Sequence, residues 1–149
     1  MVNVKILTKY FGEMEIEEDK IINFPSGLPG FIEETSFILL ELPGSPVFQI
    51  LQSIHNRDIA FVVANPYHFY EDYSFDLDDH LLTSLEINTE EDVMVLSIVT
   101  LKDPFSTSTI NLKAPIIINH MKKRGKQYIL NIDDYSIREP IGKLVGVEG

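Results

Sequence analysis

The nine residues Val93–Leu101, VMVLSIVTL, form the strongest apolar run in the chain and decide its class of fold. The run is rich in β-branched residues, which favour extended backbone. It holds the polar residues Ser97 and Thr100, and it has about half the length that a membrane-spanning helix needs. The run therefore predicts a buried strand, and no other segment is apolar over a longer stretch.

Shorter runs on both sides have the same β character. Residues 2–6 and 13–17 alternate apolar with polar side chains, a period of two that is typical of strands with one buried face. Further runs, separated mostly by prolines and other turn residues, cover 36–42, 48–53, 59–64, 107–112, 116–119 and 127–132. About nine short strands predict an all-β, single-domain, antiparallel β-barrel-like fold over residues 1–140. Residues 141–149 hold three glycines and show no periodicity, so we expect a flexible C-terminal tail there.

One segment has a helical period instead. Four leucines recur at positions that share one face of a helix: Leu77, Leu81, Leu82 and Leu85. Asp78 or Asp79 can cap the first turn, where a carboxylate also favours the helix dipole. The pattern predicts one short helix near residues 78–85, packed over an open end of the sheet.

The charge is strongly one-sided. The 149 residues carry a formal net charge of −11, and such a field repels nucleic acid and anionic membranes and attracts basic partners. Between Asp58 and Leu101 there are ten acidic residues and no Lys or Arg. One interpretation is a solvated face that keeps the protein soluble. The other is a docking face for a basic protein, because ordinary surfaces mix both signs.

The basic residues gather instead at 122–126. Their position around Gly125, between two β-runs, indicates a hairpin tip that charge keeps soluble. A phosphate-binding patch is the alternative, but sites for single-stranded nucleic acid interleave aromatic residues with the bases. Tyr128 is the only aromatic residue nearby, so direct binding of nucleic acid is not expected.

Motifs for catalysis and metal binding are not found. The absence of cysteine excludes disulfides and thiolate sites, and the four histidines stand far apart in sequence. Residues 76–80 resemble a calcium loop but lack its glycine and terminal Glu, so helix capping explains their carboxylates better. No phosphate-binding glycine loop and no nucleophile elbow occur. We therefore expect a cytoplasmic protein that is not an enzyme and has no cofactor and no metal site.

The segment Phe24–Phe31, FPSGLPGF, carries a family resemblance. Further stretches agree with the same family in order and spacing: Phe48–Ser53, Ala60–Pro66, Asp72-Tyr73, Val99-Thr100, Asn111–Ile116, Asn119, Gly125–Gln127, Tyr135 and Arg138. On these residues, from about Ile6 to Pro140, the sequence strongly resembles the flagellar assembly factor FliW family.

The resemblance implies a small, non-enzymatic β-barrel-like protein of the bacterial cytoplasm that works by exchanging partners. Members of the family bind CsrA, a homodimeric RNA-binding protein that represses flagellin translation, and they also bind flagellin in the manner of a chaperone. Free flagellin removes the factor from CsrA, which couples flagellin translation to secretion. From the charge we expect no nucleic acid or membrane as a direct partner, and we expect a monomer when no partner is bound.

The acidic stretch is the candidate binding site for such a partner. CsrA must carry positive potential to hold RNA, so carboxylates would speed its association. We predict that five of them form one face: Glu71, Asp72, Asp76, Asp78 and Asp79. Three aromatic residues among them are hypothesised to be apolar anchors, with ordinary core packing as the alternative: Phe69, Tyr70 and Tyr73. The amphipathic helices of flagellin would need an apolar groove, whose place the sequence does not indicate.

The proline- and glycine-rich segment 24–31 predicts a double turn. Phe24, Leu28 and Phe31 either anchor that turn in the core or present apolar surface to a partner, and we expect the core for Phe24 and Phe31. Two other classes of function stay open. A small-molecule-binding β-barrel would have a wide, polar interior, and a hydrolase would place two carboxylates in a cleft with a raised pKa.

Overall fold

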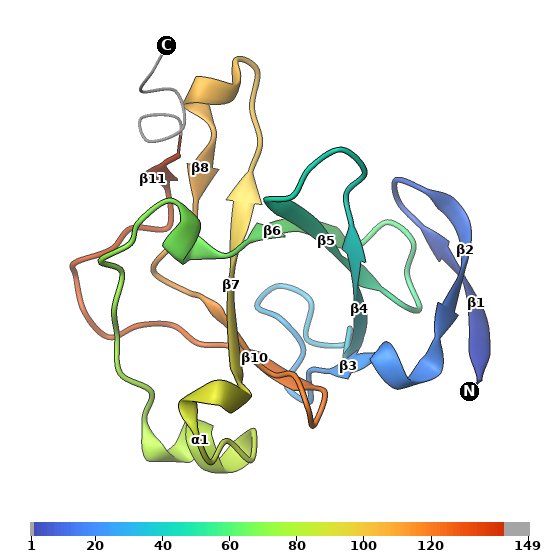
Figure 1. The fold of residues 1–149 in the computed structure, drawn as a ribbon, viewed down its shortest axis with the longest axis horizontal. Helices are drawn as coiled ribbons and strands as arrows, with labels where there is room; N and C mark the ends of the chain where they lie inside the picture. The colour runs from blue at the N-terminus through green and yellow to red at the C-terminus, as the bar shows by residue number, and fades with distance from the viewer. Residues whose placement is uncertain (1, 142–149) are drawn as a thin grey trace.

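The computed structural model describes residues 2–141, which form short strands, one helix and long connecting loops (Figure 1). The described strands number eleven: β1 (Asn3–Thr8), β2 (Gly12–Glu17), β3 (Ile22–Asn23), β4 (Ser36–Glu41), β5 (Phe48–Ser53), β6 (Ala60–Ala64), β7 (Val93–Thr100), β8 (Thr109–Ile110), β9 (Ile116–Asn119), β10 (Arg124–Gln127) and β11 (Glu139–Pro140). The helical elements in this part are α1 (Asp79–Ser84) and four 3-10 turns: η1 (Glu18–Lys20), η2 (Pro66–His68), η3 (Glu90–Asp92) and η4 (Phe105–Thr107). The all-β prediction is confirmed, with two strands more than expected.

Strand β7, the VMVLSIVTL run, is the element on which the sheet closes. Its first half pairs with β9 and its middle pairs with β6, so the order β7-β6-β5-β4-β3-β10-β9 returns to β7 as a ring. All these pairings are antiparallel except the short parallel contact between β3 and β10. The end of β7 pairs with β8, and β8 pairs with β11, both antiparallel. The β1–β2 hairpin is a separate sheet that packs its apolar face on β4 and β5.

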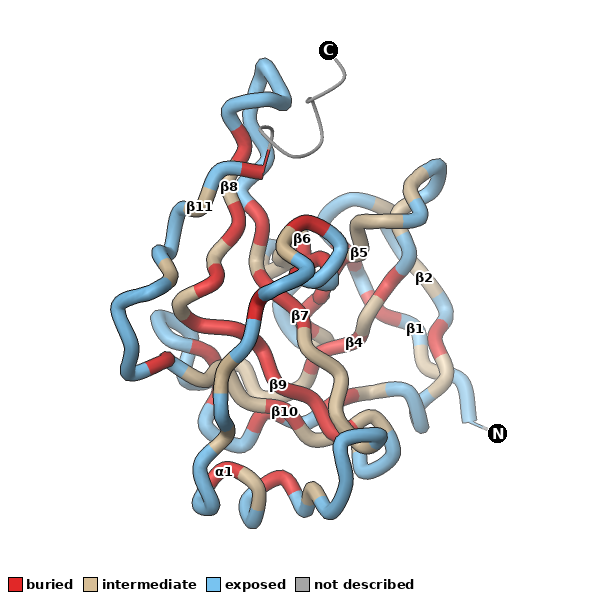
Figure 2. The backbone as a smooth tube through the Cα atoms, turned by 60° about the vertical axis from the view of Figure 1, so that its left-hand side comes forward, coloured by how far each residue is buried: buried red, intermediate tan, exposed pale blue. Residues whose placement is uncertain are grey.

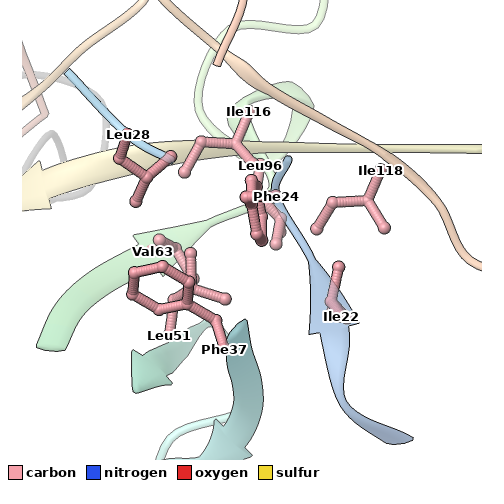
Figure 3. Packing of buried hydrophobic residues seen from close by; sticks show 9 residues of the cluster. All are labelled: Ile22, Phe24, Leu28, Phe37, Leu51, Val63, Leu96, Ile116 and Ile118. Atoms are coloured by element: carbon pink, nitrogen blue, oxygen red, sulfur yellow. The ribbon is translucent and has the colours of Figure 1, made fainter. Parts of the chain in front are cut away.

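Side chains fill the inside of this ring. Nine residues of the cluster are at most 6% exposed: Ile22, Phe24, Leu28, Phe37, Leu51, Val63, Leu96, Ile116 and Ile118 (Figure 3). The rings of Phe24 and Phe37 meet edge to face with centroids 5.4 Å apart. Gly125 in β10 leaves room for this packing, because a Cβ there would lie 2.7 Å from Cε2 of Phe24. A filled interior favours an interaction protein over a small-molecule-binding barrel.

The segment 24–31 forms the predicted double turn. The Gly27 N–H donates to the Phe24 carbonyl at 2.7 Å, and the Phe31 N–H donates to the Leu28 carbonyl at 2.7 Å. Gly27 is required at its position, because its φ is +66° and a Cβ would lie 2.5 Å from the Ile32 carbonyl oxygen. Phe24 is fully buried, as expected. The same expectation for Phe31 is wrong: the residue is 39% exposed, and its ring meets the Phe61 ring edge to face with centroids 5.6 Å apart.

The predicted helix is present as α1. Asp78 caps it, since its Oδ1 accepts a hydrogen bond from the Leu81 N–H at 2.8 Å. Leu81 and Leu85 are buried against Ile117 of β9, so the helix covers one end of the ring through the leucine face that its sequence predicts.

Two of the predicted strands differ from the structure. The run 107–112 contributes only the two residues of β8, and the run 127–132 is not a strand, because β10 ends at Gln127. Pro115 explains the second difference. It would pair with Tyr128 next along the ladder, but it has no N–H to donate, so this pair keeps one bond, from the Tyr128 N–H to the Pro115 carbonyl at 2.8 Å. Two residues on, the Leu130 N–H donates to the Lys113 carbonyl at 2.8 Å, but the Lys113 N–H donates to Asn111 Oδ1 and not across the ladder. The hairpin turn between β9 and β10 is residues 120–123, so Gly125 lies inside β10 and not at the hairpin tip that the sequence predicts.

The predicted flexible tail lies, apart from Ile141, outside the described residues. Ile141 is fully buried, and its N–H donates to the Ser108 carbonyl at 3.1 Å. It packs in a second cluster, with residues of β6, β7 and β8 and of the segments that follow β6, β8 and β10. Within residues 2–141 no helix combines the length and apolarity that crossing a membrane would require.

Asp92 gives the fold a pH-dependent contribution. The backbone N–H groups of Asn88 and Thr89 donate to its Oδ2 at 3.0 and 3.1 Å, and these bonds lower the pKa of Asp92 below 3.8. A carboxylate whose pKa is lower in the folded than in the unfolded protein stabilises the fold at pH values above its unfolded-state pKa. This contribution is lost as the pH falls through the folded-state pKa. We expect Asp92→Asn to lower the urea midpoint at about pH 6 and to change it much less at about pH 3. An equal difference at both pH values would contradict this role.

Candidate partner-binding surface

The residues predicted to bind a partner lie on the long segment that connects β6 to α1, except Asp79, which is the first residue of α1. After η2, which the Asn65 side chain caps by accepting from the Tyr67 N–H at 2.9 Å, residues 70–78 form neither helix nor strand. This segment runs down the outside of the molecule to α1 (Figure 1), and most of it is exposed (Figure 2). All five predicted carboxylates are solvent-exposed: Glu71, Asp72, Asp76, Asp78 and Asp79.

Two of the three predicted anchors are core residues. Phe69 is 5% exposed and Tyr73 is 3% exposed, so neither side chain offers apolar area to a partner in this conformation. The Tyr73 hydroxyl donates to the Leu112 carbonyl at 2.7 Å. Burial, with smaller contributions from Tyr67 and Tyr135, raises the pKa of Tyr73, which keeps this donor protonated. These two residues pack the loop against the core. For them the alternative of ordinary core packing is correct, and the hypothesis that they anchor a partner is wrong.

Tyr70 is half-buried and connects the loop to the end of the described chain. Its hydroxyl donates to the Pro140 carbonyl. Nearby, the Ser74 N–H donates to the Tyr135 hydroxyl at 3.1 Å, and the Tyr73 and Tyr135 rings meet with centroids 4.7 Å apart. The segment around residues 133–140 therefore lies beside the acidic loop.

That neighbouring segment adds charge that the sequence did not assign to the face. Asp133 and Asp134 are exposed, and Glu139 is half-buried. The segment also contains Arg138. Lys113, from the loop before β9, lies close to it, with its Nζ 3.8 Å from Asp133 Oδ1. No signal in the sequence places residues 133–139 against residues 70–76, because the contact depends on tertiary packing of tyrosines. We use "acidic surface" for the exposed carboxylates of both segments: Glu71, Asp72, Asp76, Asp78, Asp79, Asp133 and Asp134.

Asp78 has two structural partners in addition to its charge. Its Oδ1 caps α1, and its Oδ2 accepts a hydrogen bond from the Tyr128 hydroxyl at 3.2 Å. Burial, followed by this bond and the charge of Asp78, raises the pKa of Tyr128. Asp78 therefore positions the lower end of the loop, and its replacement would change local structure together with charge.

Two grooves are of interest on the surface. One lies between residues 74–76 and 128–132, has a volume of about 360 Å³ and borders the acidic surface. The other has a volume of about 620 Å³ and lies among the β1–β2 turn, β5, β6 and the end of β7. Its lining is mainly apolar and includes Tyr10, Phe11, Leu42, Phe61 and Leu101. Across residues 2–141 no three His, Asp or Glu side chains are arranged to hold a metal ion.

Comparison with known proteins places the chain in a family. The family model described as "FliW protein" matches residues 5–141. The chain belongs to the FliW family. A FliW crystal structure, titled as that of the flagellar assembly factor FliW, superposes with a TM-score of 0.89 at 43% identity and covers 93% of this chain and 96% of its own.

Curated FliW proteins agree along nearly the whole chain. The flagellar assembly factor FliW of Oceanobacillus iheyensis is 51% identical over 138 residues, which is 93% of this chain and 94% of that protein. The protein of the same name from Bacillus subtilis is 44% identical over 137 residues, covering 92% of this chain and 96% of its own length. The resemblance to FliW in the sequence is thus confirmed, and the names of these relatives describe assembly factors, a non-catalytic role.

Proposed function

We propose that this FliW family member is a cytoplasmic, protein-binding regulator of flagellar assembly that acts by exchanging two partners. It binds CsrA at the acidic surface and prevents the repressor from holding flagellin messenger RNA. Flagellin that has not been secreted binds the factor and removes it from CsrA. The chain itself carries out no catalysis and contacts neither nucleic acid nor membrane.

The observation that carries the CsrA part is the one-sided charge of the acidic surface. Five carboxylates are exposed among the nine residues 71–79, the loop and the first residue of α1, without a single Lys or Arg, in a chain of net charge −11. A protein that holds RNA phosphates needs positive potential, and opposite potentials raise the rate of encounter. Carboxylates near the RNA path would also repel phosphate, over a range of about 8 Å at physiological salt. The acidic surface therefore has to lie at the edge of the RNA site.

The apolar groove among the β1–β2 turn, β5, β6 and β7 supports the flagellin part. An amphipathic helix binds through its apolar stripe and needs a groove with such a lining. This groove shares no lining residue with the acidic surface. If flagellin binds there, its effect on CsrA requires coupling between two sites rather than competition for one.

Titration with both partners tests the proposal. The chain is titrated with CsrA by calorimetry, alone and then saturated with monomeric flagellin. We expect binding in the first titration and weaker or no binding in the second. If the chain binds neither partner in dilute buffer, the proposed function is wrong. If a complex of all three proteins forms with unchanged affinity, exchange of partners is excluded.

A further inference from the structure

The groove beside the acidic surface has the form of a slot between two extended segments. Its lining consists of Ser74, Phe75, Asp76, Tyr128, Leu130, Asn131 and Ile132, and its volume is about 360 Å³. A hydrogen bond that involves a tyrosine hydroxyl joins the two segments at each end. The Ser74 N–H donates to the Tyr135 hydroxyl at 3.1 Å, and the Tyr128 hydroxyl donates to Asp78 Oδ2 at 3.2 Å. In the described chain no other hydrogen bond joins residues 74–78 to residues 128–135. The slot is therefore held at its ends and open between them.

The lining of this slot mixes the apolar side chains of Phe75, Leu130 and Ile132 with polar groups and one carboxylate. Leu130 is buried at 4% exposure, Phe75 is half-buried, and Ile132 is 40% exposed. The Asp76 carboxylate is exposed and makes no hydrogen bond or ion pair within residues 2–141. Lys113, the base recorded near this slot, instead contacts Asp133 and the Ile132 carbonyl. The slot thus combines apolar side chains, the Tyr128 ring and a carboxylate that has no cation partner within residues 2–141.

An arginine side chain matches each of these features. Its methylene stem can lie along Phe75 and Ile132 and remove their apolar surface from water. Its planar guanidinium can stack on the Tyr128 ring while it donates two hydrogen bonds to the Asp76 carboxylate. The lysine ammonium is a compact, strongly hydrated charge and can do only part of this.

We propose that the slot receives an arginine side chain of the basic protein partner. This inference rests on the proposed function, which supplies a basic partner, and deepens it by naming the subsite and the chemical group that it takes. Arginine in the slot is the buried centre of the interface, and the remaining carboxylates of the acidic surface form its charged rim.

A matched pair of variants tests the slot against the rim. Asp76→Asn and Asp72→Asn remove the same charge from the same loop, but only Asp76 lines the slot. For CsrA binding measured by surface plasmon resonance, we expect Asp76→Asn to raise the dissociation rate about tenfold, as loss of a charge-assisted bidentate pair does. Asp72→Asn should lower the association rate slightly and leave dissociation unchanged. Ile132→Ala, which alters no charge, should raise the dissociation rate several-fold at any salt concentration.

The outcomes separate this inference from the proposed function. If CsrA binds and the two Asp variants behave alike, the slot does not receive an arginine side chain of CsrA, and the proposed function stands. If CsrA does not bind, the proposed function fails, and the slot is tested alone by NMR with a hexa-arginine peptide. We then expect the largest shift changes at Phe75, Tyr128 and Ile132, with smaller ones for hexalysine. Changes spread over all acidic regions, or equal changes with hexalysine, would overturn the assignment.

Discussion

Phe24→Ala should be the most destabilising single substitution in the ring. The Phe24 side chain is fully buried, meets Phe37 edge to face and fills the space that Gly125 leaves open. Truncation of such a side chain removes its apolar burial and leaves a cavity, which costs about 3–5 kcal/mol in the free energy of unfolding. For a chain of this length we expect the melting temperature to fall by about 10 °C or more. Denaturant unfolding measures the loss directly.

Phe31→Ala is the matched control, because it removes the same side chain from the other end of the same turn. Phe31 is 39% exposed and its aromatic contact is with Phe61 alone. We expect a loss of about 1 kcal/mol. Equal losses for Phe24→Ala and Phe31→Ala would show that the turn as a whole, and not the buried ring, stabilises the fold.

Reversal of three charges on the acidic surface should have the largest effect on partner binding. The variant Asp72→Lys/Asp76→Lys/Asp79→Lys changes the net charge by six and leaves Asp78, which caps α1, in place. Steering by an opposite potential raises association rates by about 10 to 1,000 times, so we expect association with CsrA at low salt to slow about 100-fold. Stopped-flow measurements over a range of salt concentrations should show the difference shrinking as salt rises.

The control for this variant is an equal reversal on the β1–β2 side of the molecule. Glu15, Glu18 and Asp19 are exposed and make no ion pair within residues 2–141, and β2 lies across the molecule from the acidic loop (Figure 1). Their replacement by Lys should slow association much less, because the interface lies beyond the screening length of about 8 Å. If both triple variants slow association equally, total charge and not the acidic surface governs binding.

The parts of the fold that were predictable are those whose cause is local. The apolar run of β7, the alternation in β1 and β2, and the leucine face and Asp78 cap of α1 all depend on neighbouring residues, and all are present. The run 127–132 was predicted as a strand because its own residues favour one. Its hydrogen bonds to the neighbouring segment are one-sided, because Pro115, more than ten residues away, offers no N–H and the Lys113 N–H donates to the Asn111 side chain. Ring closure through β7 and β9 likewise has no local signal.

The candidate site also has features that follow from the local sequence and features that depend on long-range contacts. Exposure of the five carboxylates follows from their charge, and the sequence predicts it correctly. The aromatic residues between them could be either anchors or core, and sequence cannot decide, since burial of Phe69 and Tyr73 depends on partners such as Leu112 and Tyr135. The contributions of Asp133 and Asp134 depend on the same long-range contacts.

Release of RNA from CsrA tests the central claim most directly. A fluorescently labelled flagellin leader RNA is bound to CsrA, and the chain is added while anisotropy is followed. We expect the unmodified chain to lower the anisotropy to that of free RNA, and the acidic-surface triple variant not to do so at the same concentration. Addition of monomeric flagellin should then restore the complex of CsrA with RNA. If RNA stays on CsrA at saturating amounts of the unmodified chain, this factor does not relieve repression and the account is wrong.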